Sequence, residues 1–426
     1  MKKPVIFWFR NDLRIGDVPA LQAAIDTGAP VVPVYVRDDR SWAEDRADIR
    51  RRQFLFESLE DLQKQLEAVG AGLWVRKGNP AVELRAVAEA FGASAVYATH
   101  EHTTEEQERE QEVEDVLDLV LEEGMTLIHP EDLPFELHQL PDVFTRFRNK
   151  VEKDWLVRPT LPSPEQITVP DGFVSEGLDA LKEDWPETDP RAVLPFRGGS
   201  DAAFDRIDHY FWSTHGLATY KETRNGLLGA DYSSKLSPWL ANGSISPREV
   251  YDEIWRFEDE VTKNESTYWL VFELLWRDYF RFVAMRHGSR LFWKAGLKPR
   301  EHWKGDVGPG ASDNRAERAF EAWKSGQSRD AFVNANMREL TATGFMSNRG
   351  RQNVASYLVH DLGVDWRWGA AHFERHLIDY DSASNWANWA YIAGVGNDPR
   401  PNRKFNTRSQ AERYDSDGAY TKTWAS

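Results

Sequence analysis

The sequence predicts an N-terminal α/β domain built on a doubly wound parallel sheet and an all-α C-terminal domain, joined by a long linker. Over the first 130 residues, short apolar and β-branched segments alternate with amphipathic helical patterns, as in parallel sheets. A proline-rich stretch follows, and nearly everything after Gly199 has helical periodicity. We therefore expect domains at 1–130 and 200–426 and a linker at 131–199.

The strands and helices of the first domain follow from these patterns. Strands are expected at 4–9, 31–36, 72–75 and 94–98, with Leu127 and Ile128 as a fifth, and helices at 20–27, 50–69, 80–91 and 105–121. In such sheets, ligands bind at the carboxyl ends of strands where the strand order reverses. No G-x-G-x-x-G sequence opens a helix here, so a dinucleotide fingerprint is missing. We interpret His100-Glu101-His102 as a solvated loop and expect no metal site.

The linker carries nine prolines between Glu131 and Arg197, which exclude long helices. One short helical pattern, at 141–154, interrupts it. We expect an extended segment that wraps the surface.

The composition is that of a soluble globular protein, with 41% hydrophobic and 29% charged residues. Cysteine is absent, which excludes disulfides and thiolate metal sites and fits a reducing compartment. No apolar segment reaches the about 20 residues that span a bilayer, and the charges that follow the first apolar segment argue against a signal peptide. We expect a cytoplasmic monomer with no membrane segment.

The net charge of −16 is unevenly distributed. Eleven acidic residues and one arginine lie between Glu101 and Glu123, whereas eight basic and three acidic residues lie between Leu270 and Lys304. A locally basic face can hold a phosphate backbone on an acidic protein. Arg281, Arg286 and Arg403 are the candidate phosphate contacts, and a solvated helix face is the alternative for both clusters.

The first polar cluster of the helical domain precedes a predicted helix start, with Ser237 as N-cap and Pro238 at the first position. Ser233, Ser234 and Lys235 come just before it and would form an anion cradle with the free amides of that helix. Plain helix capping is the alternative. The next helix begins with a capping box, from Ser246 to Glu249.

The helix expected at 266–286, with Gly288 as its C-terminal stop, has an unusual face. Trp269, Glu273, Trp276 and Phe280 share it at helical spacing. The pKa of a dry Glu273 should rise unless Arg277 or a ligand bonds it. The face is either a core surface with a Glu273–Arg277 pair or an aromatic pocket with one polar group, as a stacked base would require.

A third polar cluster lies between Asn336 and Tyr391. It interleaves apolar helix positions with groups that are costly to bury: Asn348, Arg349, Arg351, Asp379, Asp381 and Asn385. Either these groups satisfy one another in an ion-pair network, or they surround a large, planar, polar ligand. Trp366, Trp386 and Trp389 lie nearby and offer electron transfer.

These clusters belong to long ordered blocks that resemble the photolyase/cryptochrome superfamily, and its DASH-type cryptochromes most closely. The blocks run from FWFRNDLRIGD through DPRAVLPFRGG, TYKETRNGLLGADYSSKLSPWLANGSISPREVY and TGFMSNRGRQNVASYL to DYDSASNWANWAYIAGVGNDP, nearly the whole chain. Gln352 and Tyr391 are the DASH choices at their positions. The resemblance implies that the all-α C-terminal domain is an FAD-binding domain.

In that family FAD is bent into a U whose pyrophosphate meets the serine and lysine cradle. The resemblance carries the cofactor role to Tyr220, Ser233, Ser234, Lys235, Leu236, Ser237, Arg277, Asn348, Arg351, Asp379, Asp381 and Asn385. Arg351 would pair with Asp379 beside the flavin, and Asn385 would face the flavin N5.

The resemblance also implies a reaction. Photoexcited FADH⁻ passes an electron to a cyclobutane pyrimidine dimer flipped out of DNA, preferentially single-stranded, and the electron returns after the dimer splits. The substrate residues would be Arg224, Glu273, Trp276, Asn348, Arg349, Gln352 and Tyr391. Trp389, Trp366 and Trp303 would relay electrons to the flavin, with Trp323 as a substitute for Trp303. Glu106 is the candidate contact for a folate antenna (5,10-methenyltetrahydrofolate).

One block departs from the family pattern. Arg329, Ala331 and Asn334 stand where the family has Gly, Pro and an acid, which puts the turn near the flavin pocket in doubt. A dimer-specific photolyase, a photoreceptor that binds FAD with little repair, and a nucleotide-binding protein without photochemistry are the three functions to be distinguished.

Overall fold

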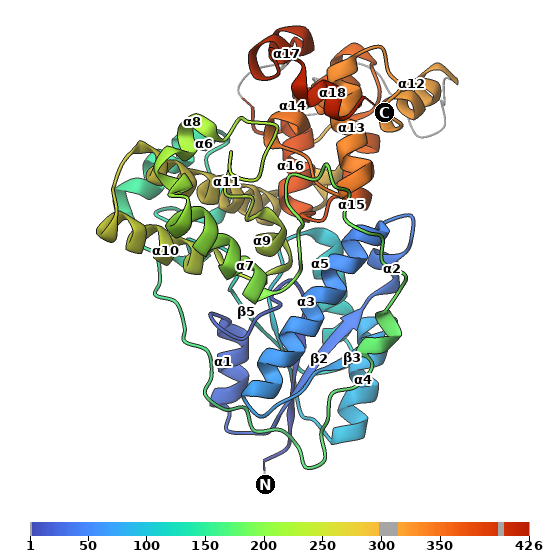
Figure 1. The fold of residues 1–426 in the computed structure, drawn as a ribbon. Helices are drawn as coiled ribbons and strands as arrows, with labels where there is room; N and C mark the ends of the chain where they lie inside the picture. The colour runs from blue at the N-terminus through green and yellow to red at the C-terminus, as the bar shows by residue number, and fades with distance from the viewer. Residues whose placement is uncertain (1, 298–313, 399–403, 426) are drawn as a thin grey trace.

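The computed structural model of the chain describes residues 2–297, 314–398 and 404–425 and contains an α/β domain and a helical domain (Figure 1). The sheet of the first domain has five parallel strands in the order β3-β2-β1-β4-β5. The strands are β1 (Val5–Phe9), β2 (Val31–Arg37), β3 (Trp74–Lys77), β4 (Val96–Thr99) and β5 (Leu119–Glu122). The helices of this domain are α1 (Pro19–Asp26), α2 (Asp39–Trp42), α3 (Ile49–Ala68), α4 (Pro80–Phe91) and α5 (Thr104–Glu114).

The sheet is doubly wound, as predicted. Alternate residues of β1 face opposite sides of the sheet, because side chains alternate along a strand. Phe7 and Phe9 pack in one cluster with residues of α1 and α3, whereas Ile6 and Trp8 pack in another with residues of α4 and α5. Both faces are therefore covered, which explains the continuous apolar character of the central strand.

The predicted fifth strand was wrong. The helix expected at 105–121 ends at Glu114, and Leu119–Glu122 form the edge strand β5 beside β4. Leucine and valine occur in both helices and strands. Residues 119–122 form a strand because pairing with β4 gives hydrogen-bond partners to the backbone groups at the edge of the sheet. Leu127 and Ile128 are instead a buried loop whose amides donate to the Asp278 carboxylate at 3.0 and 2.8 Å.

The linker joins both domains rather than only covering them. Its helix α6 (Phe144–Val151) packs in the helical core against α11, and its later part adds Ile167 and Leu181 to the α/β core. The amide of Val75 donates to the carbonyl of Glu176 at 2.8 Å, which ties the linker to β3. In Figure 1 the linker runs down one side of the sheet and returns to the helices.

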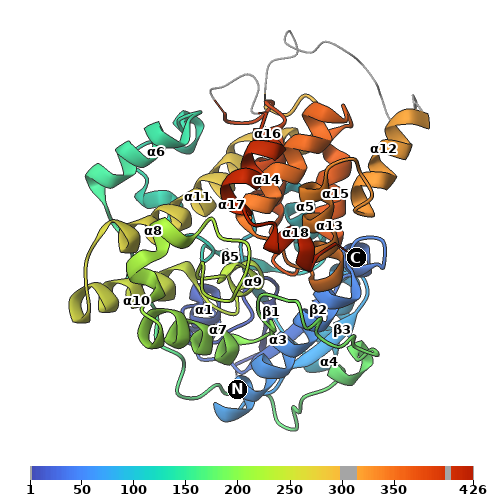
Figure 2. The ribbon, with the colours of Figure 1, turned by 45° about the horizontal axis from the view of Figure 1, so that its top comes forward.

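The helical domain forms two groups of helices (Figure 2). The first group is α7 (Ser200–Ile207), α8 (Tyr220–Thr223), α9 (Ser237–Asn242), α10 (Pro247–Glu260) and α11 (Glu265–His287). The second is α12 (Asn314–Lys324), α13 (Ala331–Thr343), α14 (Asn348–Ser356), α15 (Trp366–His376), α16 (Ser382–Ile392), α17 (Thr407–Tyr414) and α18 (Ala419–Thr423). Short 3₁₀ or π turns lie at Pro130–Asp132, Leu137–Gln139, Glu152–Asp154, Leu178–Leu181, Asp208–Ser213, Gly216–Thr219, Gly288–Phe292 and Tyr357–Asp361.

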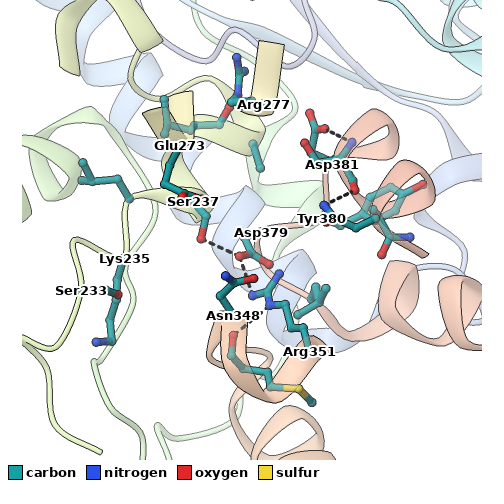
Figure 3. Close-up of a pocket in the computed structure, with 18 of the residues that line it drawn as sticks. Ser233, Lys235, Ser237, Glu273, Arg277, Asn348, Arg351, Asp379, Tyr380 and Asp381 are labelled. Carbon is teal, nitrogen blue, oxygen red and sulfur yellow. Dashed lines mark hydrogen bonds and ion pairs between the residues drawn. The ribbon is translucent and has the colours of Figure 1, made fainter. Parts of the chain in front are cut away.

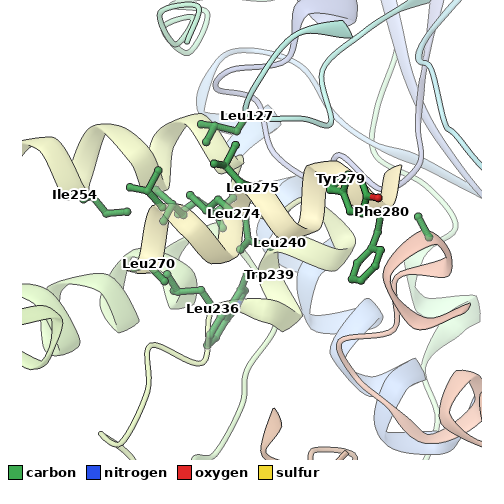
Figure 4. Close-up of a cluster of buried hydrophobic side chains, with 14 of the residues drawn as sticks. Leu127, Leu236, Trp239, Leu240, Ile254, Leu270, Leu274, Leu275, Tyr279 and Phe280 are labelled. Carbon is green, nitrogen blue, oxygen red and sulfur yellow. The ribbon is translucent and has the colours of Figure 1, made fainter. Parts of the chain in front are cut away.

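Helix α11 is the centre of the first group. Leu270 and Leu274 of α11 lie toward the side chains of Leu236 and Trp239 in one buried cluster (Figure 4). Gly288 ends α11 with a positive φ of 53°, as predicted, because glycine adopts that conformation without strain. In the part of the chain that the structure describes, no helix combines the length and apolarity needed to cross a bilayer.

The loop after β1 connects the two domains. Asp17 accepts hydrogen bonds from the Ser246 hydroxyl at 2.5 Å and from Arg248 Nε at 3.0 Å, and Arg14 donates to the carbonyl of Gly243 at 2.9 Å. The predicted capping box from Ser246 to Glu249 is present at the start of α10. All three charged groups are buried, so the α/β domain is held rigidly against α9 and α10.

Candidate functional site

A cavity of about 310 Å³ lies in the helical domain, among α9, α11, α14 and α16 (Figure 3). The structure brings to its wall every residue that the sequence predicted for a cofactor: Tyr220, Ser233, Ser234, Lys235, Leu236, Ser237, Arg277, Asn348, Arg351, Asp379, Asp381 and Asn385. These residues come from distant parts of the chain. We call this space the inner cavity.

Asp379 is the hub of its polar wall. Its Oδ2 accepts from Arg351 Nη2 at 2.7 Å and from the Ser237 hydroxyl at 2.6 Å. Its buried Oδ1 has no hydrogen-bond partner among the described residues. A buried carboxylate oxygen needs a donor, so this atom fits a ligand N–H group.

Ser237 was predicted as a helix N-cap, and that role was wrong. Leu236 occupies the N-cap position of α9, and no side chain caps it. The Ser237 hydroxyl donates to Asp379 instead. The ion-pair interpretation of the third polar cluster is thus correct for Arg351 and Asp379, yet the pair borders a cavity.

Arg281 was predicted to contact phosphate, and this was also wrong. It is 3% exposed and forms an ion pair with Asp381. Burial raises the pKa of Asp381, but the charges of Arg281 and Arg277 outweigh burial and keep that pKa below its usual value. Arg286 is paired with Asp142 at 2.9 Å, and Arg403 lies outside the described residues.

Arg277 does not pair with Glu273, the alternative considered from sequence. Its guanidinium donates to the carbonyls of Met125 and Leu240. Burial, together with the charge of Arg281, lowers the pKa of Arg277 to about 9. Arg277, Arg281 and Arg286 all have partners within the protein, so the stretch from Leu270 onward is less of a basic face than its composition indicates.

The lysine of the predicted anion cradle does not extend into the inner cavity. The ammonium of Lys235 donates to the carbonyls of Gly229 and Ala230 at 3.2 and 2.7 Å and lies over the ring of Tyr232. Burial lowers the pKa of this ammonium to about 6. Lys235 adopts a positive φ of 54°, which turns its main chain, rather than its side chain, to the cavity.

Asn385 is buried and also lines the inner cavity. Its Nδ2 donates to the carbonyl of Ala370 at 3.0 Å, which leaves Oδ1 as an acceptor. Trp389 lies one helical turn further along α16 and also lines the cavity. An acceptor and a redox-active ring thus border the same space.

A second cavity, of about 530 Å³, adjoins the first and is called the outer cavity. Its wall contains every residue that the sequence predicted for the substrate: Arg224, Glu273, Trp276, Asn348, Arg349, Gln352 and Tyr391. Glu273, Asn348 and Gln352 line both cavities, so the two spaces meet at these side chains.

The outer cavity has aromatic walls and polar groups at its base. The ring of Trp276 stacks on Phe144 at 3.7 Å and 12°, and meets Tyr391 edge to face at 5.9 Å. Glu273 forms an ion pair with Arg224. Burial raises the pKa of Glu273 although Arg224 opposes the shift.

Arg349 lines the outer cavity. Its Nη2 donates to Asn225 Oδ1 at 2.7 Å and its Nη1 to Gln352 Oε1 at 3.0 Å. The guanidinium also lies over the ring of Tyr414. These contacts hold a cation at the wall of the outer cavity.

The predicted tryptophan relay is partly described. Trp389 and Trp366 are buried in one cluster, and Trp303 lies outside the described residues. Trp323, the predicted substitute, lies 6.2 Å from Trp389 between ring centroids. Trp293 is 45% exposed and precedes Lys294, the residue whose carbonyl accepts from Trp366 Nε1 at 3.1 Å. No local signal in the sequence links Trp293 to Trp366.

A third cavity, of about 110 Å³, lies between the domains at the carboxyl ends of β1, β2 and β4. The strand order reverses beside β1, so the sheet rule predicted this position. Glu106 lines it and accepts from the Thr103 hydroxyl at 2.8 Å. Burial and the nearby Glu101 raise the pKa of Glu106 to about 7.

The loop after β4 was predicted to be solvated, and that was wrong. Glu101 and His102 are buried, and His102 Nε2 lies 2.9 Å from Glu123. The interface with the helical domain covers this end of the sheet, which the sequence of the loop does not reveal.

The departing block from Ser328 to Asn334 lines none of these three cavities. Asn334 Oδ1 accepts from the amide and the hydroxyl of Ser328 at 2.8 and 2.7 Å, and its Nδ2 donates back to the Ser328 carbonyl at 2.9 Å. The side-chain amide of Asn334 therefore closes the turn together with Ser328 and Asp330.

Two family models match the chain: DNA photolyase over residues 5–165, and the FAD binding domain of DNA photolyase over residues 269–426. The second match supports FAD as the ligand of the inner cavity. Its residues fit that ligand, since Asp379 Oδ1 and Asn385 Oδ1 are acceptors for ring N–H groups.

Curated relatives and solved structures agree. The chain is 46% identical to a cryptochrome DASH of Gloeobacter violaceus (99% of this chain, 85% of that protein) and 44% identical to one of Xenopus laevis (99% and 82%). A Synechocystis sp. cryptochrome superposes with a TM-score of 0.90 at 44% identity, covering 100% of this chain and 89% of that one. A bacterial class III photolyase from Agrobacterium tumefaciens gives 0.84 at 28% identity, covering 100% and 86%. The chain therefore belongs to the photolyase/cryptochrome superfamily, among the DASH-type cryptochromes.

Proposed function

We propose that the protein is a blue-light-dependent photolyase that repairs cyclobutane pyrimidine dimers, preferentially in single-stranded or looped DNA, as a cytoplasmic monomer. The observation that carries this proposal is the junction of the two cavities. Glu273 and Asn348 line both, so a DNA base in the outer cavity and a flavin in the inner cavity would share the same polar groups.

The chemistry of the reaction comes from the cofactor: reduced FAD, excited by blue light, lends an electron to the dimer and recovers it. The protein orients both partners. Asp379 and Asn385 supply acceptors to the flavin ring, and Arg351 holds Asp379 in place.

The outer cavity binds the flipped bases. Trp276 and Tyr391 offer flat apolar faces on adjacent sides, which suits the two fused pyrimidines. Glu273, with its raised pKa, supplies a carboxyl group that bonds a base edge, and Asn348 and Gln352 supply amides. Unpaired bases reach this cavity at a smaller unstacking cost than paired ones, which favours single strands.

Trp389, Trp366 and the exposed Trp293 form the route by which electrons from solvent reductants would reach the inner cavity. Trp389 borders that cavity, Trp366 lies in the same buried cluster, and Trp293 reaches the surface. Trp303 remains the predicted third member, beside Trp323 as its substitute.

We also propose that the interdomain cavity holds a folate antenna, 5,10-methenyltetrahydrofolate, with Glu106 as a contact. The cavity is lined by the aromatic rings of Trp8, Tyr35 and Trp42 and by Glu106, a combination that suits a planar ring with N–H donors.

The test is repair of a single-stranded oligonucleotide with one thymine dimer, under blue light, by the reduced protein. Light-dependent recovery of the two thymines, faster than in the matching duplex, is expected. Glu273→Gln should slow recovery, because the amide cannot ionise to pair with Arg224 and no longer presents a carboxyl group to the base. Absence of recovery on single strands would reject the proposal.

A photoreceptor with little repair is the second candidate, favoured by the cryptochrome names of the curated relatives and by the buried tryptophans. A photoreceptor should show flavin photoreduction that is lost in Trp389→Phe. Neither the natural protein nor this variant should then repair dimers.

A further inference from the structure

The loop from Gly229 to Ser237 is held from behind by one arginine. Arg206, on α7, is 4% exposed. Its Nε donates to the carbonyl of Ser234 at 2.9 Å, and its Nη2 to the carbonyls of Ser233 and Ala230 at 2.9 and 3.0 Å. Its Nη1 donates to Asp231 Oδ1 at 2.9 Å. One guanidinium thus binds three main-chain carbonyls and a carboxylate of the same loop.

These bonds determine where the amides of the loop point. In a trans peptide the N–H group lies opposite the carbonyl of the preceding residue. Because the carbonyls of Ser233 and Ser234 point to Arg206, the amides of Ser234 and Lys235 point away from it. Neither amide donates to another group among the described residues, although both residues are buried and line the inner cavity.

The conformation of the loop makes the amide of Lys235 converge with the amides that follow it. Lys235 has a positive φ of 54°, whereas Leu236 has a φ of −77°. Such an alternation of hand turns successive N–H groups into one concave anion-binding nest. Buried amides without acceptors are unfavourable, so the loop has the form that a ligand with several anionic oxygens would complete.

Neither nearby cation reaches the inner cavity. The guanidinium of Arg206 and the ammonium of Lys235 share the carbonyl of Ala230, and both lie behind the loop. The nest is therefore built from main-chain dipoles, and the cations act on its shape.

We propose that Arg206 is the positioning residue that shapes this loop to receive the diphosphate of FAD. The inference rests on FAD as the ligand of the inner cavity. Arg206 does not touch the cofactor; it holds the carbonyls back so that the amides face the phosphates. A planar guanidinium with five donors serves four acceptors at once, and a lysine ammonium cannot reproduce that geometry.

The test compares a flavin that has the diphosphate with one that lacks it. Apoprotein, prepared by removing bound flavin, is titrated with FAD and with riboflavin by flavin fluorescence. We expect Arg206→Gln to weaken FAD binding by about 100-fold and riboflavin binding by less than about 3-fold. Arg206→Lys should weaken FAD binding almost as much, because it keeps the charge but not the fork.

Arg248→Gln is the matched control, since Arg248 is also buried and ion-paired but lies at the contact with Asp17. It should lower the midpoint of thermal unfolding without changing the ratio of FAD to riboflavin affinity.

Equal losses of FAD and riboflavin affinity in Arg206→Gln would overturn the inference, as would full recovery in Arg206→Lys, which would assign the effect to charge. If the glutamine variant does not fold, the lysine variant decides alone. Failure of the unmodified protein to bind FAD would instead reject the flavin site itself.

Discussion

Arg224, the residue directly after α8, forms an ion pair with the carboxylate of Glu273 in the middle of α11. The two residues are 49 positions apart in the chain. Their pair lies where the inner and outer cavities meet. A helical i, i+4 pair with Arg277 was the local alternative, and the structure gives Arg277 two carbonyl partners instead.

Replacing Arg224 by glutamine should shift the titration of Glu273 to higher pH. Burial raises the pKa of Glu273 and Arg224 opposes that shift, so loss of the arginine leaves burial unopposed. We expect the midpoint in the pH dependence of dimer binding to rise. Lys221→Gln, in the same cavity, should weaken binding without moving the midpoint. An unmoved midpoint in both variants would contradict the assignment.

Replacing Asp379 by asparagine should weaken FAD binding. The change keeps the shape of the side chain but removes the charge that faces Arg351 and one acceptor for a ring N–H. We expect a loss of affinity of about 10- to 100-fold, measured by release of flavin fluorescence. Asp365→Asn, at the start of α15 and away from the cavity, is the control and should leave the affinity unchanged.

The contact between domains should be sensitive to Asp17. Asp17→Asn leaves the buried Arg248 without its counter-ion and should lower the free energy of unfolding by about 3 kcal/mol. Urea unfolding measures the loss, and limited proteolysis should show earlier cleavage between the domains. Asp39→Asn removes an exposed carboxylate of the same domain and should change the stability by less than about 0.5 kcal/mol.

Glu339 should make stability depend on pH. Burial raises its pKa to about 8, while the Tyr420 hydroxyl donates to it at 2.6 Å. The folded state then binds a proton that the unfolded state has lost, so stability falls between pH 4.5 and about 8 and is full below that window. Within that window, the free energy of unfolding falls by about 1.4 kcal/mol for each pH unit.

Lys235 produces the opposite slope above pH 6, because burial lowers its pKa from 10.5 to about 6. The measurement is therefore the difference in unfolding free energy between the natural protein and Glu339→Gln. As the pH rises from about 5 to about 8, the natural protein should lose stability relative to the glutamine variant. A constant difference would show that Glu339 does not titrate there.

The relay predicts a separation of photoreduction from repair. Trp389→Phe and Trp366→Phe should abolish light-driven reduction of oxidised flavin, because phenylalanine is much harder to oxidise than tryptophan. Both variants should still repair dimers once reduced chemically. Trp293→Phe tests the surface end, and Trp255→Phe, exposed and outside the cluster, is the control. Repair lost together with photoreduction would contradict this scheme.

Periodicity was enough for most of the fold. The alternation of apolar segments and helical patterns predicted the parallel sheet, and the capping box at Ser246 and the glycine stop at Gly288 were confirmed. The edge strand at Leu119 was missed because short apolar segments suit both helix and strand, and only pairing with β4 distinguishes them.

The residues that line the inner and outer cavities could also be predicted, because the long blocks that resemble the family identify them one by one. The hydrogen-bond and ion-pair partners of those residues could not be predicted from the sequence. Arg281 was placed on DNA but pairs with Asp381, Ser237 was read as a cap but bonds Asp379, and Lys235 was aimed at a phosphate but lies behind its loop.

The sequence by itself determined the layers, the helical domain and which residues surround the inner cavity. Only the tertiary structure decided which charge meets which, how deeply Glu106, Glu273 and Glu339 are buried, and that Arg206 holds the loop that lines the inner cavity. The reason is physical: periodicity and residue type act over a few neighbouring residues, whereas ion pairs and desolvation depend on groups that folding brings together from distant parts of the chain.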